Sequence, residues 1–215
     1  HGLPPEVVRE TAEEEDVTVE VPDNFYAMIA ERHLVEPPKE EAEIAKKLEP
    51  FVENLPETRL MYYDDSYKIA FEAKVLRVLD KRYVVLDQTV FYPEGGGQPA
   101  DHGVLKFGNK NCRVVDVQKV GRVIVHLVEG NVPRKNVKVE GVLDWPRRYS
   151  LMKAHTATHL LMGAARCVLG EHVWQSGTQK DVERSRLDIS HFRRLTLEET
   201  QKIEELANQA LFRIF

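Results

Sequence analysis

The spacing of apolar residues changes along the chain from a helical period to a strand-like one. Near the start, Phe25, Met28 and Ile29 lie three and four positions apart, so three apolar side chains share one helical face. A mostly charged stretch over residues 39–49, with a proline directly after it, is typical of a helical connector. The pattern predicts helices separated by prolines over residues 1–58.

From residue 59 onward the apolar period is two. Ile69, Phe71, Ala73 and Val75 occupy alternate positions, which is the pattern of a half-buried strand. Several short strands at close spacing predict a small antiparallel β-barrel over residues 59–143. The other β-like runs, which are separated by turn residues, cover 83–86, 103–107, 112–120, 122–128 and 137–143.

A helical period returns after the barrel. Asp144 is a suitable N-cap for a long helix that runs to about Leu169, and Gly170 supplies a common helix stop. Alternation over residues 185–191 predicts a strand, and Thr196–Glu199 is a capping box that opens a last amphipathic helix. The order of elements predicts an α+β protein that begins with a helical segment, continues into the barrel and ends in a mixed region.

The charges are distributed unevenly between the two parts of the chain. The net charge is −5, but residues 1–58 hold 16 Asp and Glu against 5 Lys and Arg, while residues 59–215 hold 19 against 25. The second part therefore has the charge to bind a polyanion such as a nucleic acid. Basic residues also solvate ordinary surfaces, so charge alone leaves both interpretations open.

Composition and cysteine content indicate the compartment. No stretch approaches the roughly 18 consecutive apolar residues that a membrane span needs, and the two cysteines, Cys112 and Cys167, suit a reducing environment. We therefore expect a cytoplasmic protein with no membrane partner. Because the chain opens at His1 without a start methionine and stops at Phe215 inside an amphipathic run, we also expect a segment of a larger protein.

The long helix carries a pair of histidines with the spacing of metal ligands. His155 and His159 lie four positions apart, so their side chains project from one face and can converge on one ion, for which zinc is the natural candidate. Alternatively, the two rings cap a polar edge of the core. A stable zinc site needs three or four ligands, and Cys167 lies too far along the same helix to supply one.

A glycine-rich run over residues 91–103 follows the first strands. Its three successive glycines, Gly95, Gly96 and Gly97, allow positive φ and a close approach of the backbone to a ligand. It matches neither a P-loop nor a dinucleotide-binding fingerprint, because no Gly-Lys-Ser/Thr follows and strands rather than a helix come next. The alternative is a structural loop that joins two strands.

Together these two features resemble one family, the alanyl-tRNA synthetases, and within it the editing region that free-standing editing proteins share. The resemblance rests on the run Phe91–Gln98 with Asp101 and Gly103, then on Asp144-Trp145 with Arg148, then on His155–Leu161. The start, His1–Glu6, resembles the segment that leads out of the synthetase's tRNA-recognition region. This favours a full synthetase, and the long connector suggests the archaeal type.

The resemblance implies a division of the chain and a reaction. Residues 1–58 would be the helical end of the tRNA-recognition region with its linker, 59–143 the barrel, and 144–215 the first part of an α/β editing domain. The implied reaction is zinc-dependent hydrolysis of mischarged Ser-tRNA and Gly-tRNA within an alanine–tRNA ligase. ATP and magnesium would serve only the aminoacylation domain of the parent protein, and the partners would be tRNA-Ala and the synthetase's other domains.

The resemblance also assigns roles to individual residues. His155 and His159 would bind zinc, and the family's Cys-x-x-x-His motif that completes the site is missing from this sequence. Gln175 would belong to the editing pocket, with Thr156 and Thr158 as hydrogen-bond partners for a serine hydroxyl or a water. Arg186, Asp188 and His191 would lie beneath the pocket, although the first two could form an ordinary surface ion pair. The expected substrate loop consists of Gly95, Gly96, Gly97, Gln98 and Asp101.

Basic residues near the start of the long helix are candidates for contacts with the tRNA backbone. They are Arg147, Arg148 and Lys153, with Arg134, Lys135 and Lys138 in the barrel as further candidates. Their alternative role is a solvated surface. For the whole chain, the alternatives to an editing segment are a metal-free tRNA-binding module and a free-standing deacylase.

Overall fold

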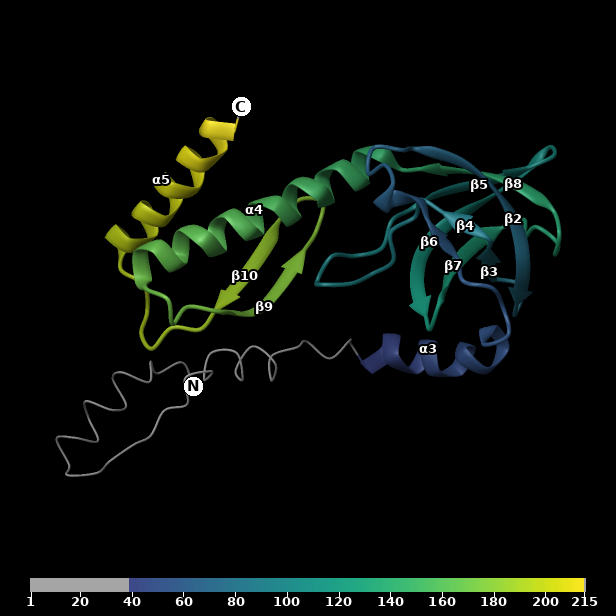
Figure 1. Ribbon diagram of the computed structural model, residues 1–215, viewed down its shortest axis with the longest axis horizontal. Coiled ribbons are helices and arrows are strands. Elements are labelled where there is room, and N and C mark those ends of the chain that lie inside the picture. Colours follow the sequence, from purple (N-terminus) through teal and green to yellow (C-terminus); the bar gives the residue numbers. More distant parts are fainter. Residues whose placement is uncertain (1–38, 215) are drawn as a thin grey trace, which may run out of the picture. The chain divides into compact units, whose positions relative to one another are not determined.

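The computed structural model describes residues 39–214, and the side chains of residues 44–212 (Figure 1). The helices predicted before residue 39 lie outside this range. The described chain divides into two compact units. The barrel unit contains residues up to Met152 together with 181–183, and the hairpin unit contains residues 153–180 and 184–214.

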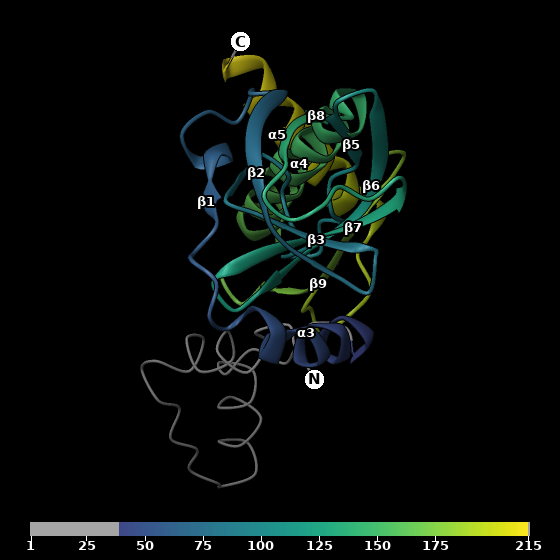
Figure 2. The same ribbon diagram turned by 90° about the vertical axis from the view of Figure 1, so that its right-hand side faces the viewer.

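Six strands of the barrel unit close into a barrel in the order β2-β3-β7-β6-β5-β8, and all neighbours are antiparallel (Figures 1 and 2). The predicted barrel is thereby confirmed, with strand ends displaced by a few residues at most. The strands are β2 (Ala70–Leu79), β3 (Tyr83–Leu86), β5 (Gly103–Phe107), β6 (Lys110–Val120), β7 (Val123–Gly130) and β8 (Lys138–Leu143).

The interior of the barrel follows the predicted alternation. Phe71, Ala73 and Val75 point into the core, whereas Ile69, just before β2, is exposed. Phe71 lies opposite Gly141 on β8, where a Cβ atom would come within 2.2 Å of the Phe71 ring. The glycine therefore makes room for the large ring at this point of the barrel wall.

Helix α3 (Lys39–Val52) packs on the barrel. Leu48 and Val52 are buried against barrel residues such as Val120 and Val123. The predicted helix over residues 39–49 is present, and it continues through Pro50 to Val52. Burial of Val52, which is 3% exposed, accompanies this extra turn.

Short elements complete the wall of the barrel unit. Strand β1 (Arg59–Leu60) pairs in parallel with β4 (Gln88–Thr89), and the 3₁₀ turn η1 (Met61–Tyr63) follows β1 directly. Two-residue strands carry too little alternation to be recognised in a sequence, and none of these elements was predicted.

The second part of the described chain contains α4 (Trp145–Leu169), β9 (Gln175–Lys180), β10 (Ser185–Ile189) and α5 (Leu197–Ile214). Helix α4 begins in the barrel unit and continues into the hairpin unit, where β9 and β10 form an antiparallel hairpin. Ala164, Val173, Ile203 and Ala207 form a small core of the hairpin unit. The predicted α+β class is confirmed, and no helix among the described residues is long and apolar enough to cross a membrane.

The helix signals in the sequence operate as predicted. Asp144 Oδ1 accepts a hydrogen bond from Arg147 N at 3.2 Å, and Gly170 has a φ of 110° after the last turn of α4. At α5, Glu199 N donates to Thr196 Oγ1 at 3.2 Å while Thr196 N donates to the Glu199 carboxylate at 2.8 Å. This reciprocal pair is a capping box.

Candidate functional site

The predicted site residues fall into two groups, one in each compact unit. The group in the barrel unit consists of Gly95, Gly96, Gly97, Gln98, Asp101, Arg147 and Arg148, and the group in the hairpin unit of Lys153, His155, Thr156, Thr158, His159 and Gln175.

The histidine pair lies on one face of α4. The ring centroids of His155 and His159 are 5.0 Å apart, with 34° between the ring planes. His155 is half-buried and His159 is exposed, and neither belongs to the apolar core that α4 forms with α5. The spacing predicted from the sequence is therefore confirmed, and the two imidazoles are accessible to a ligand.

A buried lysine lies beside this pair. Burial, then the charge of Lys180 and then that of His159 lower the pKa of His155, which favours the neutral imidazole that binds metals. Lys180 is the last residue of strand β9 and is 4% exposed, and burial lowers its pKa as well. No pattern in the sequence pointed to this residue, because a lysine in a polar run such as Gln175–Lys180 is normally solvated.

The other polar candidates of the hairpin unit differ in exposure. Thr158 is 3% exposed, and its hydroxyl donates to the carbonyl of Ala154 at 2.8 Å, one turn earlier in α4. Its proton is thus used within the helix, so as a hydrogen-bond partner for a serine hydroxyl or a water it would act through its oxygen as an acceptor. Thr156 is exposed on α4, and Gln175 is exposed at the start of β9, opposite Ile189 of β10.

The described residues fit two positions of a zinc site. His155 and His159 have the donor chemistry for zinc, but no group of three or more His, Cys, Asp or Glu gathers anywhere in the described part of the chain. Cys112 is buried in the barrel, where burial raises the pKa of its thiol to about 11. Cys167 lies on α4 beside α5, away from the histidines, as the sequence predicted.

Arg148 does not fit the prediction that it contacts tRNA phosphate. Its side chain is 4% exposed and that of Asp101 is 1% exposed, and the two form a buried ion pair through several hydrogen bonds. The same guanidinium donates to the carbonyl of Val90 at 2.6 Å and to that of Ser66 at 3.4 Å. These donors are directed into the protein, so Arg148 ties three segments of the barrel unit together.

Asp101, in turn, holds the glycine-rich run. It accepts a hydrogen bond from Tyr92 N at 2.6 Å, and its own N donates to Tyr92 O at 3.0 Å. Gly95 and Gln98 exchange backbone hydrogen bonds, and Gly96 and Gly97 between them have φ of 60° and 72°, as in a type I′ turn. Asp101 is therefore buried and stabilises this loop through its hydrogen bonds to Tyr92, and it is not exposed to a substrate.

Among the basic candidates, Arg147 and Lys153 remain compatible with a contact to tRNA. Arg147 is half-buried, and its Nε donates to the carbonyl of Ala100 at 3.2 Å. Lys153 is exposed.

Residues after α4 join the two ends of the β9–β10 hairpin. His172 Nε2 and His191 Nδ1 lie 2.9 Å apart with their rings stacked, and Ser190 N donates to Trp174 O at 2.8 Å. These contacts hold the segment that precedes Gln175. Arg186 and Asp188, 3.2 Å apart and both exposed, form the surface ion pair that the sequence allowed.

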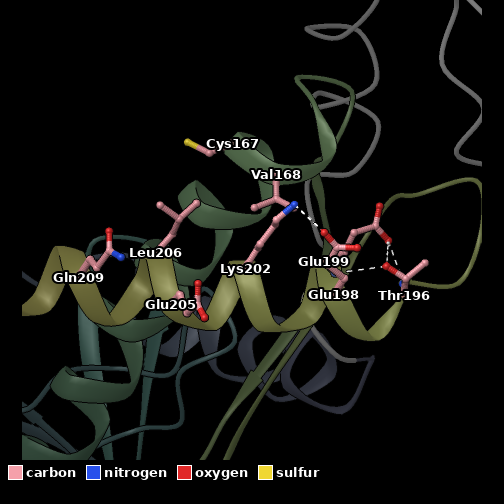
Figure 3. A pocket seen from close by; sticks show the side chains of 9 residues that line it. All are labelled: Cys167, Val168, Thr196, Glu198, Glu199, Lys202, Glu205, Leu206 and Gln209. Atoms are coloured by element: carbon pink, nitrogen blue, oxygen red, sulfur yellow. Dashed lines mark hydrogen bonds and ion pairs between the residues drawn. The ribbon is translucent and has the colours of Figure 1, made fainter.

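A hollow of about 630 Å³ lies between α4 and α5 (Figure 3). Cys167 and Val168 of α4 face Leu206 and Lys202 of α5 across it, and Lys202 Nζ bonds to the Glu198 carboxylate at 2.9 Å. None of the predicted site residues lines this hollow, so its size does not make it a candidate for the chemistry.

Comparison with known proteins gives the family. A family model described as tRNA synthetases class II (A) matches residues 1–147. The chain is 55% identical over 213 residues, 98% of its length, to Alanine--tRNA ligase of Pyrobaculum neutrophilum, of which it covers 23%. It is 51% identical over 210 residues to the Pyrococcus abyssi protein of that name and 48% over 218 residues to that of Methanopyrus kandleri. These two matches cover 97% and 99% of this chain and 23% and 24% of the respective relatives.

The chain therefore belongs to the class II (A) tRNA synthetase family and, within it, to the alanyl-tRNA synthetases. It spans about a quarter of the length of the curated relatives that it matches. The resemblance found in the sequence is confirmed.

Proposed function

We propose that the chain is a segment of an alanine–tRNA ligase and contributes to the zinc-dependent hydrolysis of mischarged Ser-tRNA and Gly-tRNA. The observation that carries this proposal is the accessible pair of imidazoles on α4, 5.0 Å apart, in a member of the alanyl-tRNA synthetase family. A second hydrolytic site is chemically necessary, because a pocket shaped for alanine admits glycine and rejects serine only weakly.

His155 and His159 would hold zinc as two of its ligands. When bound, the ion supplies a Lewis acid that polarises the ester carbonyl, activates a water or holds the amino group of the substrate. Lys180 contributes a positive charge beside His155, which discourages protonation of the imidazole and favours an anionic group nearby.

The remaining groups bind and orient the substrate. Gln175, exposed at the start of β9, offers an amide that donates and accepts hydrogen bonds to a serine hydroxyl or a water. Thr156, exposed on α4 within one turn of both histidines, offers a hydroxyl. Arg147 and Lys153 would contact the tRNA backbone, and the excess of basic residues after position 58 would attract it.

The number of ligands favours one competing function, a metal-free tRNA-binding module. The described residues supply two imidazoles, whereas catalytic zinc sites use three protein ligands. In such a module His155 and His159 would serve the fold or bind tRNA directly. The two functions differ in whether removing an imidazole abolishes hydrolysis.

The test is deacylation by the full-length protein with His155→Ala. Hydrolysis of Ser-tRNA is expected to fall to the uncatalysed rate, whereas ATP-dependent activation of alanine stays intact because a separate domain performs it. Cys167→Ala is the matched control, since Cys167 lies on the same helix but lines the α4–α5 hollow, and it should leave both reactions unchanged. Undiminished hydrolysis by the His155 variant would remove the metal from the mechanism and leave the binding module.

A further inference from the structure

Aromatic residues gather on the barrel unit around the buried Arg148–Asp101 pair. The sequence contains 7 tyrosines and 2 tryptophans, and most of them contribute to this one cluster. Its members are Tyr62, Tyr63, Tyr67, Tyr92, Trp145 and Tyr149. We call this set the aromatic surface.

One part of the aromatic surface lies at the start of α4. Trp145 and Tyr149 are one helical turn apart, and their rings stack with centroids 5.8 Å apart and 26° between the planes. Tyr67, from the loop after η1, lies 5.7 Å from Trp145. Tyr67 is 63% exposed and Tyr149 is 44% exposed, so ring faces of this group are open to solvent.

The other part lies on η1 and the glycine-rich run. Tyr62 is 4.7 Å from Tyr63 and 5.2 Å from Tyr92, measured between ring centroids. Burial raises the pKa of Tyr62 and of Tyr92, so both phenols remain uncharged at neutral pH. Tyr63, which contacts Tyr62, is 77% exposed.

The buried ion pair fixes the segments that carry both parts. Arg148 bonds to the carbonyl of Ser66, between the two exposed tyrosines of the loop, and Asp101 bonds to Tyr92 N. Arg148 itself lies between Trp145 and Tyr149 on α4. Because this framework is already ordered, binding a ligand against the rings would cost little further ordering entropy.

The chemistry of the aromatic surface favours unpaired nucleobases over an apolar protein segment. Its exposed side chains are tyrosines, whose rings have polar hydroxyl edges. Flat, open aromatic faces stack on any base, and single-stranded nucleic acids are bound in this way. Arg147 on the same turn of α4 and the 25 basic against 19 acidic residues after position 58 complement a phosphate backbone.

The two carboxylates of the loop have partners within the same unit. Asp64 is paired with Arg59 at 2.9 Å, and Asp65 accepts a hydrogen bond from Tyr67 N at 2.9 Å. Both acids are therefore engaged in the loop that presents Tyr67.

We infer that Tyr63, Tyr67, Trp145 and Tyr149 form a stacking site for unpaired nucleotides of an RNA end. This inference rests on the proposed function in one respect, the choice of tRNA as the RNA. It adds a binding site on the barrel unit to the histidines of the hairpin unit, and it gives the buried Asp101 and Arg148 a role as support for the rings instead of direct contact.

The experiment measures binding of the chain to two RNA probes at several salt concentrations. One probe is a single-stranded octanucleotide that ends in CCA, and the other is a blunt RNA duplex. Tyr67→Leu and Tyr149→Leu keep apolar bulk but remove the ring, and each should weaken binding of the single strand by about tenfold. Tyr67→Phe and Tyr149→Phe keep the ring and should retain the affinity.

Two further measurements separate stacking from other effects. Phe51→Leu is the matched control, because Phe51 is 53% exposed on α3 of the same unit and lies outside the aromatic surface. In a Trp174→Phe background, the single strand should quench the fluorescence of Trp145, whereas the duplex should not.

The outcomes distinguish this inference from the proposed function. Leucine variants that bind the single strand as tightly as the unaltered chain would overturn the stacking site and indicate that the rings pack on protein instead. An equal loss on both probes would overturn it too, since only phosphate contacts would then be affected. Lack of binding to either RNA would overturn the stacking site, while loss of deacylation in the His155→Ala protein would still support the editing function.

Discussion

A buried guanidinium is stable only where acceptors surround it, and Arg148 meets this condition. Asp101 and the carbonyls of Val90 and Ser66 receive its donors, while its neighbour Arg147 is half-buried. The sequence places the two arginines side by side after Trp145-Pro146 and does not say which one points inward. That choice depends on the position of Asp101, 47 residues earlier, which only the closed barrel brings into reach.

Loss of the Arg148 side chain should therefore lower stability and not simply weaken tRNA binding. Arg148→Met leaves the Asp101 carboxylate buried without its partner, and removing one member of a buried pair costs about 3–5 kcal/mol. Urea unfolding of the chain measures this change. Arg59→Met, which breaks the exposed pair with Asp64, is the control and should cost about 1 kcal/mol or less. Equal effects of the two substitutions would show that the Arg148 pair contributes no more than a surface pair.

At the scale of elements, a buried network of hydrogen bonds around His126 links strands of the barrel unit. His126 of β7 is fully buried, and its Nδ1 faces the carbonyl of Val84 on β3 at 3.0 Å, so Nδ1 carries the hydrogen. Its Nε2 lies 2.9 Å from Thr89 Oγ1 on β4 and accepts the proton of that hydroxyl, while the hydroxyl oxygen accepts a hydrogen bond from Phe91 N. The network is complete only with a neutral imidazole, and it joins β3, β4 and β7.

This network predicts sensitivity of the barrel to acid. Burial lowers the pKa of His126 from 6.5 to about 4. As the pH falls, the imidazole of the unfolded chain is protonated near pH 6.5, whereas that of the folded chain stays neutral until about pH 4. The contribution of His126 to the free energy of unfolding is therefore full above pH 6.5 and is lost as the pH falls towards 4. The loss amounts to about 3 kcal/mol. Unfolding free energies measured across this interval should show a slope that is smaller by one proton in His126→Gln, and identical slopes would contradict the assignment.

Elements with strong alternation could be predicted, and elements without it could not. The strands that became β2, β5 and β8 have apolar residues at every second position, and the caps of α4 and α5 have specific hydrogen-bonding residues. Strand β9, with the sequence QSGTQK, has no alternation of apolar residues and was not predicted. Pairing with β10 stabilises this strand, and its own β-propensity is low. Such a tertiary effect cannot be recognised from the local sequence.

At the scale of the whole molecule, the division of the chain into compact units depends on contacts between distant residues. Helix α3, expected as a connector, is part of the barrel unit, and α4 begins in one unit and ends in the other. Helix α4 is continuous across this boundary, so the sequence pattern of a single helix could not reveal it. The histidine pair was predictable, because spacing within one helix fixes it, whereas Lys180 reaches it only through the β9–β10 hairpin.

The chain as a whole is expected to bind zinc weakly. Structural zinc sites gain roughly 10–16 kcal/mol from four ligands, and the described residues offer His155 and His159 to the ion, with no third ligand gathered beside them. Equilibrium dialysis of the chain should show binding that fails to reach one equivalent at low micromolar free zinc, and the full-length protein should bind far more tightly. In the chain, His155→Ala should reduce the remaining binding, while His102→Ala, a histidine of the barrel unit, should not. Stoichiometric tight binding by the chain would mean that residues other than this pair complete the site.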